Sequence, residues 1–178
     1  THSQINIINI DTAGSNYNFE SSTVGSGQAG YSHSTTSVKI HSGASANTDH
    51  YNGYSIYFVD GPAANDLRVI SDYDGAGVIT VPTLSGTPVD GNSFVISPTV
   101  TVSGDGEGAS VRATGTTGSG LTGLTVLNAG SGYSNAVITI AGNTSSTPTP
   151  VNPTATAIIE PYGGHGYDAV KELGGYNV

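Results

Sequence analysis

Short runs of alternating apolar and polar residues follow one another along the chain, separated by turn-forming residues. Successive side chains of a strand point to opposite faces, so this alternation predicts strands with one buried face. In the first half the runs are Ser3–Ile10, Thr36–His41, Tyr54–Val59, Asp66–Ser71 and Val78–Pro82. In the second half they are Ser93–Ile96, Thr99–Ser103, Ala109–Ala113, Leu121–Leu127, Ala136–Ala141 and Thr154–Glu160.

Helix signals are weak by comparison. Ala44–Tyr51 lacks strand character and predicts at most a short helical turn capped by Ser42 or Ser45, and Asp168–Leu173 can form about one turn. The 26 glycines, with abundant Ser, Thr and Asn, favour turns and strands over helix interiors. The 35% of hydrophobic residues supply material for a core. The sequence therefore predicts an all-β fold with little helix.

The pattern of apolar and polar residues changes near Val89–Asn92, where the alternating runs become longer. This change predicts two small β units of meander or sandwich-like form. Residues 1–90 form the first meander unit, residues 91–160 form a unit of glycine-rich hairpins, and residues 161–178 form a connecting segment.

The second half also contains an internal sequence repeat. Thr99–Gly104 (TVTVSG) resembles Val137–Gly142 (VITIAG), 38 positions later when counted from Gly104 to Gly142, and a small-residue strand follows each. Ala13–Tyr17 (AGSNY) is similarly matched by Ala129–Tyr133 (AGSGY). These matches predict duplicated β-hairpin units, although a solenoid would need about three copies.

Composition excludes several partners. Four basic residues against 13 acidic ones give a net charge of −9, which repels nucleic acid. No run approaches the roughly 18 apolar residues of a membrane-spanning helix, so no membrane partner is expected. Without cysteine there is neither disulfide nor thiolate zinc site. Without methionine, Thr1 is expected to be a processed terminus, a fragment boundary or the first ordered residue of a longer chain.

Metal and cofactor sites have little support. Asp72 and Asp74, with Asp60 or Asp66 nearby, supply oxygen atoms that Ca²⁺ prefers, but their spacing is not that of an EF-hand and an Asx turn is the favoured interpretation. Gly104–Gly108 (GDGEG) lacks the Lys-Ser/Thr of a phosphate-binding loop and predicts a tight hairpin turn. No cofactor is expected.

Catalytic signatures are similarly sparse. The five histidines are scattered through unrelated segments, and no nucleophile elbow is present. A glycoside hydrolase fragment would need two carboxylates facing each other across a cleft, which a sequence does not reveal. We therefore expect no enzymatic activity.

The ten tyrosines, against three phenylalanines and no tryptophan, are a further feature. Tyr51, Tyr54, Tyr57 and Tyr73 are concentrated in one predicted meander. They suit either an interface or a sugar-stacking platform, or, as the favoured alternative, they cover strand surfaces and lend their hydroxyls to loops.

Two stretches resemble known phage proteins. Ala44–Asp74 is similar to a module of tailed-phage structural proteins that contains an "ASA…D.YNG..I" strand entry and an "R.I.DY.G" turn. Leu124–Tyr176 resembles the central region of baseplate wedge proteins of T-even-like contractile phages, including those that infect cyanobacteria, in which "GSGY…VTI.G" hairpins precede "P.GGHG.D.V.ELG". The matching positions there are Pro161, Gly163, Gly164, His165, Gly166, Asp168, Val170, Glu172, Leu173 and Gly174.

The resemblance implies a structural part of a virion, placed in the tail baseplate, with no cofactor or reaction. It implies that the partners are other subunits of the same assembly, that the chain is oligomeric in that context, and that residues 161–174 are a rigid connector to the main body of the wedge. The glycines of this segment permit a backbone bend, which we expect His165, the side chain among them that can form hydrogen bonds, to anchor. Family members extend beyond both ends of this sequence, so an internal or incompletely traced portion is expected. The alternative is an extracellular carbohydrate-binding or adhesive fibre module.

Overall fold

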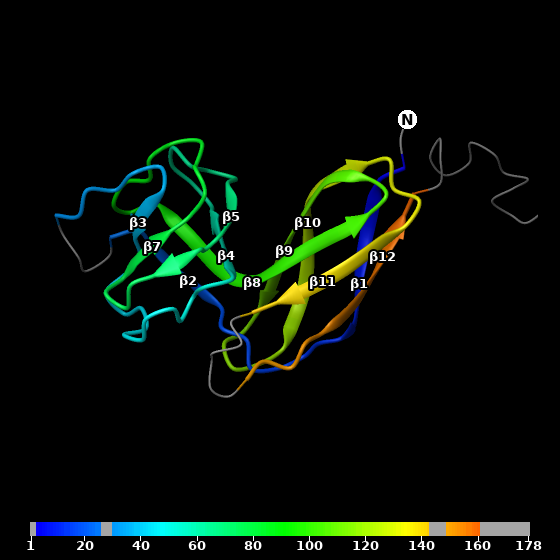
Figure 1. The fold of residues 1–178 in the computed structure, drawn as a ribbon, viewed down its shortest axis with the longest axis horizontal. Helices are drawn as coiled ribbons and strands as arrows, with labels where there is room; N and C mark the ends of the chain where they lie inside the picture. The colour runs from blue at the N-terminus through cyan, green and yellow to red at the C-terminus, as the bar shows by residue number, and fades with distance from the viewer. Residues whose placement is uncertain (1–2, 26–29, 143–148, 161–178) are drawn as a thin grey trace, which may run out of the picture.

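The computed structural model describes residues 3–25, 30–142 and 149–160, and these form an all-β protein without any helix. Figure 1 shows two lobes joined by one long strand. The strands are β1 (Ile5–Thr12), β2 (Glu20–Thr23), β3 (Ser37–Lys39), β4 (Tyr54–Phe58), β5 (Leu67–Val69), β6 (Asp72–Tyr73), β7 (Val78–Thr80), β8 (Ser93–Gly104), β9 (Glu107–Gly115), β10 (Leu121–Ser131), β11 (Ala136–Ala141) and β12 (Thr154–Ile159).

The first lobe contains two small sheets around one core. In the first sheet, β4 and β2 pair with the beginning of β8, and β5 pairs with β4. In the second sheet, β7 lies between β3 and β6. Side chains of β3, β4, β6, β7 and the beginning of β8 fill this core, and its largest buried side chains are Tyr51, Tyr54, Tyr73, Phe58 and Phe94.

The second lobe is a ring of six strands. β9 and β11 pair with the end of β8, β10 pairs with β9, and β1 pairs with β12. The ring is completed by contacts of β12 with β11 and of β1 with β10, so the order around the core is β10, β9, β8, β11, β12, β1. Inward-facing Ile, Val, Leu and Ala side chains fill the interior. β1 and β12, which are far apart in sequence, thus pair with each other and complete the ring around one core.

The ring contains an internal duplication. The similar segments Thr99–Gly104 and Val137–Gly142 lie side by side, because β8 and β11 pair antiparallel. β10 pairs with β9 as β1 pairs with β12, and the ladders of both pairs are interrupted at matching places. The interruptions fall at Ile5/Ile7 and Ile10/Thr12 in β1, and at Leu121/Gly123 and Val126/Asn128 in β10. β1 therefore completes the second copy.

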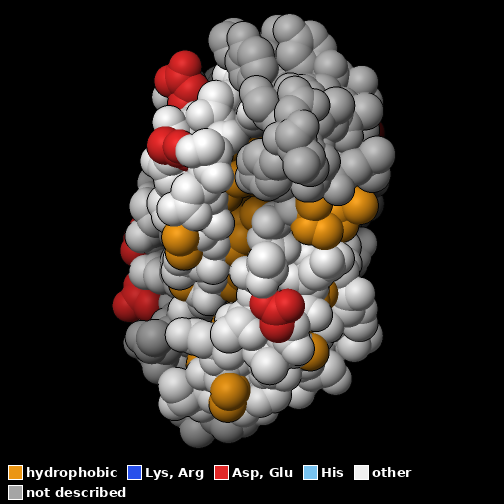
Figure 2. Space-filling view, turned by 90° about the vertical axis from the view of Figure 1, so that its right-hand side faces the viewer, with side chains coloured by type: hydrophobic (Ala, Val, Ile, Leu, Met, Phe, Trp, Pro, Cys, Tyr) orange, Lys and Arg blue, Asp and Glu red, His pale blue; other side chains and the backbone are white. Residues whose placement is uncertain are grey.

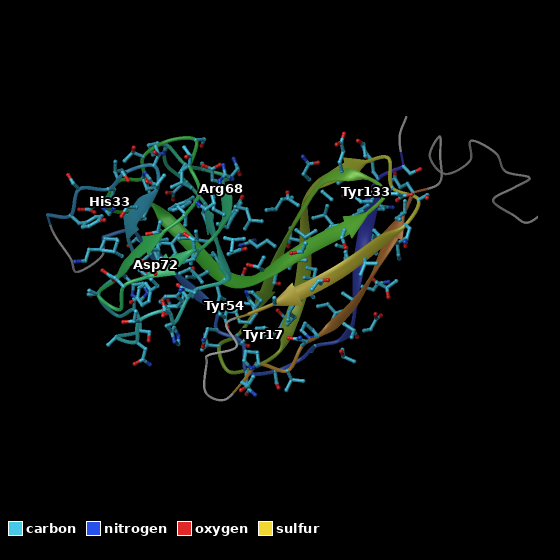
Figure 3. The ribbon with its side chains drawn as sticks, viewed as in Figure 1. Tyr17, His33, Tyr54, Arg68, Asp72 and Tyr133 are labelled. Atoms are coloured by element: carbon cyan, nitrogen blue, oxygen red, sulfur yellow. The ribbon has the colours of Figure 1, made fainter. Side chains whose placement is uncertain are left out.

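The two matching pentapeptides share one backbone conformation. Gly14 and Asn16 have φ of 64° and 64°, and Gly130 and Gly132 have φ of 65° and 78°. Positive φ at alternate positions turns the chain at the end of β1 and of β10, and a buried tyrosine follows each turn, Tyr17 in one copy and Tyr133 in the other. Figure 3 shows these tyrosines at opposite ends of the second lobe.

Several expectations differ from the structure. Ser93–Ile96 and Thr99–Ser103 belong to one strand, β8, which continues through Pro98. Ala44–Tyr51 forms bends and turns rather than a helical turn. β2 lies outside every run that the sequence predicts to be a strand, because its Ser- and Thr-rich sequence has no apolar alternation.

The packing also groups the segments differently from the expected division into residues 1–90 and 91–160. β1 packs with the second lobe, and the beginning of β8 packs with the first. A local change in the length of the alternating runs carries no information about pairing between strands that are distant in sequence. The expected connector and the helical turn at Asp168–Leu173 lie outside the described residues.

Candidate binding site between the two lobes

A cleft lies between the lobes on one face of the bent β8. Residues that pair across antiparallel strands share a face, so the registers Leu67–Tyr57–Val95 and Thr99–Arg112–Thr125 place side chains of β5, β4, β8, β9 and β10 on this face. Figure 1 shows the bend of β8 where it passes between the lobes. The cleft has a volume of about 390 Å³ and is lined by Tyr57, Asn65, Leu67, Arg68, Ser110, Leu127 and Asn128. We call it the interlobe cleft.

Tyr57, which lines the interlobe cleft, contacts Arg112 of β9 and so joins the two lobes beside the cleft. The guanidinium carbon of Arg112 lies 4.9 Å from the centroid of the Tyr57 ring, within the range of a cation–π contact. The Tyr57 hydroxyl donates a hydrogen bond of 2.9 Å to Asn65 Oδ1. The contact therefore fixes both the ring and the cation at the junction.

Arg68, on the β5 side of the cleft, is neutralised within its own lobe. Its Nη2 lies 2.9 Å from Asp66 Oδ1, and its Nε and Nη1 donate to the carbonyl oxygens of Thr83 and Leu67. The second oxygen of Asp66 accepts from both the amide and the hydroxyl of Ser85. This network holds the 82–85 loop and leaves little free charge on Arg68.

Tyrosines fill the junction on the other face of β4. Tyr54 and Tyr17 lie together where the lobes meet (Figure 3), and a Cβ built on Gly142 would be 2.8 Å from the Tyr17 ring. Burial, and then the neighbouring Tyr54, raises the pKa of Tyr17 from 10.0 to about 12. The junction is therefore packed on one face and open on the other.

Three of the four tyrosines proposed as interface residues are buried. Tyr51, Tyr54 and Tyr73 are at most 1% exposed, and their hydroxyls bond to loop and strand groups. Of the four, Tyr57 lines the interlobe cleft, whereas the burial and hydroxyl bonds of the other three agree with the favoured alternative for them, that tyrosines cover strand surfaces and lend their hydroxyls to loops. Alternation places Tyr54 on the core face of β4 and Tyr57 on the opposite face, but sequence does not indicate which face is covered.

The partly buried carboxylate of Glu20 explains the position of Tyr51. The Tyr51 hydroxyl donates to Glu20 Oε1, and the Gly43 amide donates to His41 Nδ1, so the neutral ring carries its proton on Nε2 and donates to Glu20 Oε2 at 3.0 Å. Burial, and then the hydrogen bond to Glu20, raises the pKa of Tyr51 strongly. The group ties β2 to the two ends of the segment that connects β3 with β4.

The other acidic candidates act within turns. Asp74 Oδ1 accepts from the amides of Ala76 and Val78, which is an Asx turn before β7, and Asp72 is exposed on β6. Among residues 3–25, 30–142 and 149–160, no group of three His, Asp or Glu side chains is placed to hold a metal ion. Asp105 accepts from the Ser134 hydroxyl and from the amides of Ser134 and Asn135, and these bonds lower its pKa.

A second hollow, of about 490 Å³, lies between β2 and the end of β9, with Phe19, Val95 and Thr114 among its walls. Its one carboxylate belongs to Glu20, which is already bound by Tyr51 and His41.

The part of the chain that the structure describes has no helix, and so none that is long and apolar enough to cross a membrane.

Comparison of this chain with protein-family models, with curated proteins and with solved structures finds no match.

Proposed function

We propose that this chain is a non-catalytic structural module of a larger protein assembly, and that the assembly is the baseplate wedge of a contractile phage tail. The observation that carries the proposal is a row of outward-facing apolar side chains on three successive strands of the second lobe. Val137 of β11 is 54% exposed, Ile158 of β12 is 41% exposed and Ile7 of β1 is 50% exposed. We call these three residues the apolar stripe.

The apolar stripe has a local cause. The ladder between β1 and β12 is irregular between Ile5 and Ile7, so Ile5 and Ile8 are both buried while Ile7 turns outward opposite Ile158. Exposed apolar side chains on neighbouring strands are typical of contact surfaces in assemblies. Figure 2 shows orange apolar side chains on this end of the molecule, together with red acidic groups and no basic ones among the described residues in view.

The use of the acidic groups also supports a structural role. Glu20, Asp66, Asp74 and Asp105 each accept hydrogen bonds from neighbouring loops, which is the arrangement of groups that stabilise turns. The resemblance of Ala44–Asp74 and Leu124–Tyr176 to phage tail proteins supplies the specific assembly, with other wedge subunits as partners and the virion as the location.

The alternative of a carbohydrate-binding or adhesive module is less supported. It relied on a platform of exposed tyrosines, and Tyr51, Tyr54 and Tyr73 are buried. One face of the Tyr57 ring is covered by Arg112. A sugar platform would need aromatic faces open to solvent.

The test is to label purified particles of a phage that encodes the chain with antibodies raised against it. Label at the tail end that persists after high-salt washing is expected. Label on the fibres alone would favour the adhesive module, and particles without the protein would overturn the proposal. Ile158→Thr should lower incorporation into particles, whereas Val89→Thr, at an exposed loop position outside the apolar stripe, should not.

A further inference from the structure

The guanidinium of Arg112 has no hydrogen-bond or ion-pair partner among the described residues. Its Nε is buried and unpaired, and the ring of Tyr57 is the neighbour that it contacts through its charge. A partly buried cation that lacks an acceptor is costly, and native proteins seldom leave one without a reason. Arg68, which lines the interlobe cleft, differs because Asp66 neutralises it. Arg112, which contacts the lining residue Tyr57, is thus a cation next to the cleft whose charge no described residue neutralises.

The duplication indicates that the ring of strands does not require an arginine at this position. Arg112 pairs with Thr125 between β9 and β10, and Thr156 pairs with Asn9 between the matching strands β12 and β1. Thr156 donates a hydrogen bond of 2.8 Å to Asp11, and is therefore satisfied within its own copy. The same place in the fold accepts a small, neutral residue, so the arginine is not explained by strand pairing.

We propose that the interlobe cleft binds an extended segment of a neighbouring subunit, with Arg112 pairing with an Asp or Glu carboxylate of that segment. The guanidinium fork matches the geometry of a carboxylate, and Arg112 would then gain the acceptor that it lacks. The chain as a whole carries a net charge of −9, so the attraction of an acidic segment to this cleft depends on the local charge of Arg112. The identity of the partner as a subunit rests on the proposed function.

The walls favour a peptide over an acidic sugar. Leu67 and Leu127 come from opposite lobes and both line the interlobe cleft, which provides apolar contact for a side chain next to the carboxylate. Asn65, Ser110 and Asn128 add polar groups that suit a peptide backbone. One of the two faces of the Tyr57 ring, on which a sugar ring could stack, is covered by Arg112.

The test uses the complete chain and two synthetic peptides, acetyl-Ala-Glu-Leu-Ala-amide and its Gln counterpart, followed by NMR of the Arg112 Nε–H and the Tyr57 ring. The Glu peptide is expected to shift both signals saturably, with affinity about tenfold or more above that of the Gln peptide, as for other charge-assisted pairs. Arg112→Gln should remove this preference. Lys39→Gln should keep it, because Lys39 has a similar ring contact, but with Tyr31, which does not line the cleft.

Equal binding of the two peptides, equal loss in Arg112→Gln and Lys39→Gln, or no shift at Arg112 would each overturn the proposal. Shifts at Arg112 produced by an oligoglucuronate but not by the Glu peptide would overturn it in favour of an acidic sugar. If Arg112→Gln does not fold, the two peptides on the unaltered protein still decide. This measurement needs no phage particle, so its failure is separable from that of the proposed function.

Discussion

Tyr51 and Glu20 are 31 positions apart in the chain, and the Tyr51 hydroxyl donates a hydrogen bond of 2.5 Å to the Glu20 carboxylate. The bond joins β2 to the loop before β4, and His41 holds the other oxygen of the same carboxylate. A short edge strand with a polar sequence thus acquires a fixed place through one side chain.

Tyr51→Phe is expected to lower the free energy of unfolding by about 2 kcal/mol, because it removes a partly buried hydrogen bond to a charged acceptor. Urea denaturation followed by circular dichroism measures the change. Tyr57→Phe is the control, since the bond of its hydroxyl to Asn65 is exposed, and should cost less than about 0.5 kcal/mol. Equal losses in the two variants would contradict the role given to the Glu20 contact.

Alkaline pH should destabilise the protein through its buried tyrosines. The pKa of Tyr17 is raised from 10.0 to about 12, and the pKa values of Tyr51 and Tyr73 are also raised, in each case mainly by burial. The unfolded chain loses these protons first. The stability is therefore fully present below pH 10 and is lost as pH rises from about 10 towards 12.

Urea midpoints measured over that range, together with tyrosinate absorbance, test this dependence. Tyr17→Phe should have a shallower decline with pH than the unaltered protein. Tyrosines that all ionise near pH 10 while the fold persists would show that the interior does not hold them neutral.

Acid should act through Asp105, whose carboxylate receives hydrogen bonds from Ser134 and Asn135. The Ser134 hydroxyl first, and then these backbone amides, hold the pKa of Asp105 below its ordinary 3.8. A depressed folded-state pKa contributes stability above the unfolded pKa and loses it as pH falls below that value. Asp105→Asn should thus be less stable than the unaltered protein at pH 7, with the gap closing below about pH 4. Asp72→Asn, on the exposed β6, is the control in thermal unfolding at both pH values; a gap that persists unchanged in acid would count against the mechanism.

Gly120→Ala should be much more damaging than Gly118→Ala. A Cβ at Gly120 would lie 2.4 Å from the carbonyl oxygen of Gly14, which is backbone and cannot move away alone. A Cβ at Gly118 meets nothing within 4 Å, and its φ of +77° is the remaining cost. We expect a loss of about 1 kcal/mol for Gly118→Ala and more than about 2 kcal/mol for Gly120→Ala in urea denaturation. Similar losses would show that the turn around Gly14 adjusts readily.

Local sequence was enough to find most of the strands, because alternation is a property of consecutive residues. Ala136–Ala141 was predicted with the bounds that β11 has, and the all-β fold with little helix is confirmed. The matching pentapeptides ending in Tyr17 and Tyr133 were visible in the sequence, since their shared turn depends on their own glycine and asparagine residues. β2 and β6 were missed, because they are short, polar strands that neighbours rather than their own pattern hold in place.

Only the tertiary structure decided what these elements build. Pairing between β1 and β12 joins the two ends of the described chain and makes β1 the last strand of the second copy, which no local pattern can express. The same pairing turns Ile7 outward, and the bend of β8 brings Arg112 over Tyr57. Alternation gives each strand two faces, but which face becomes core, stripe or cleft depends on contacts between residues that are distant in sequence.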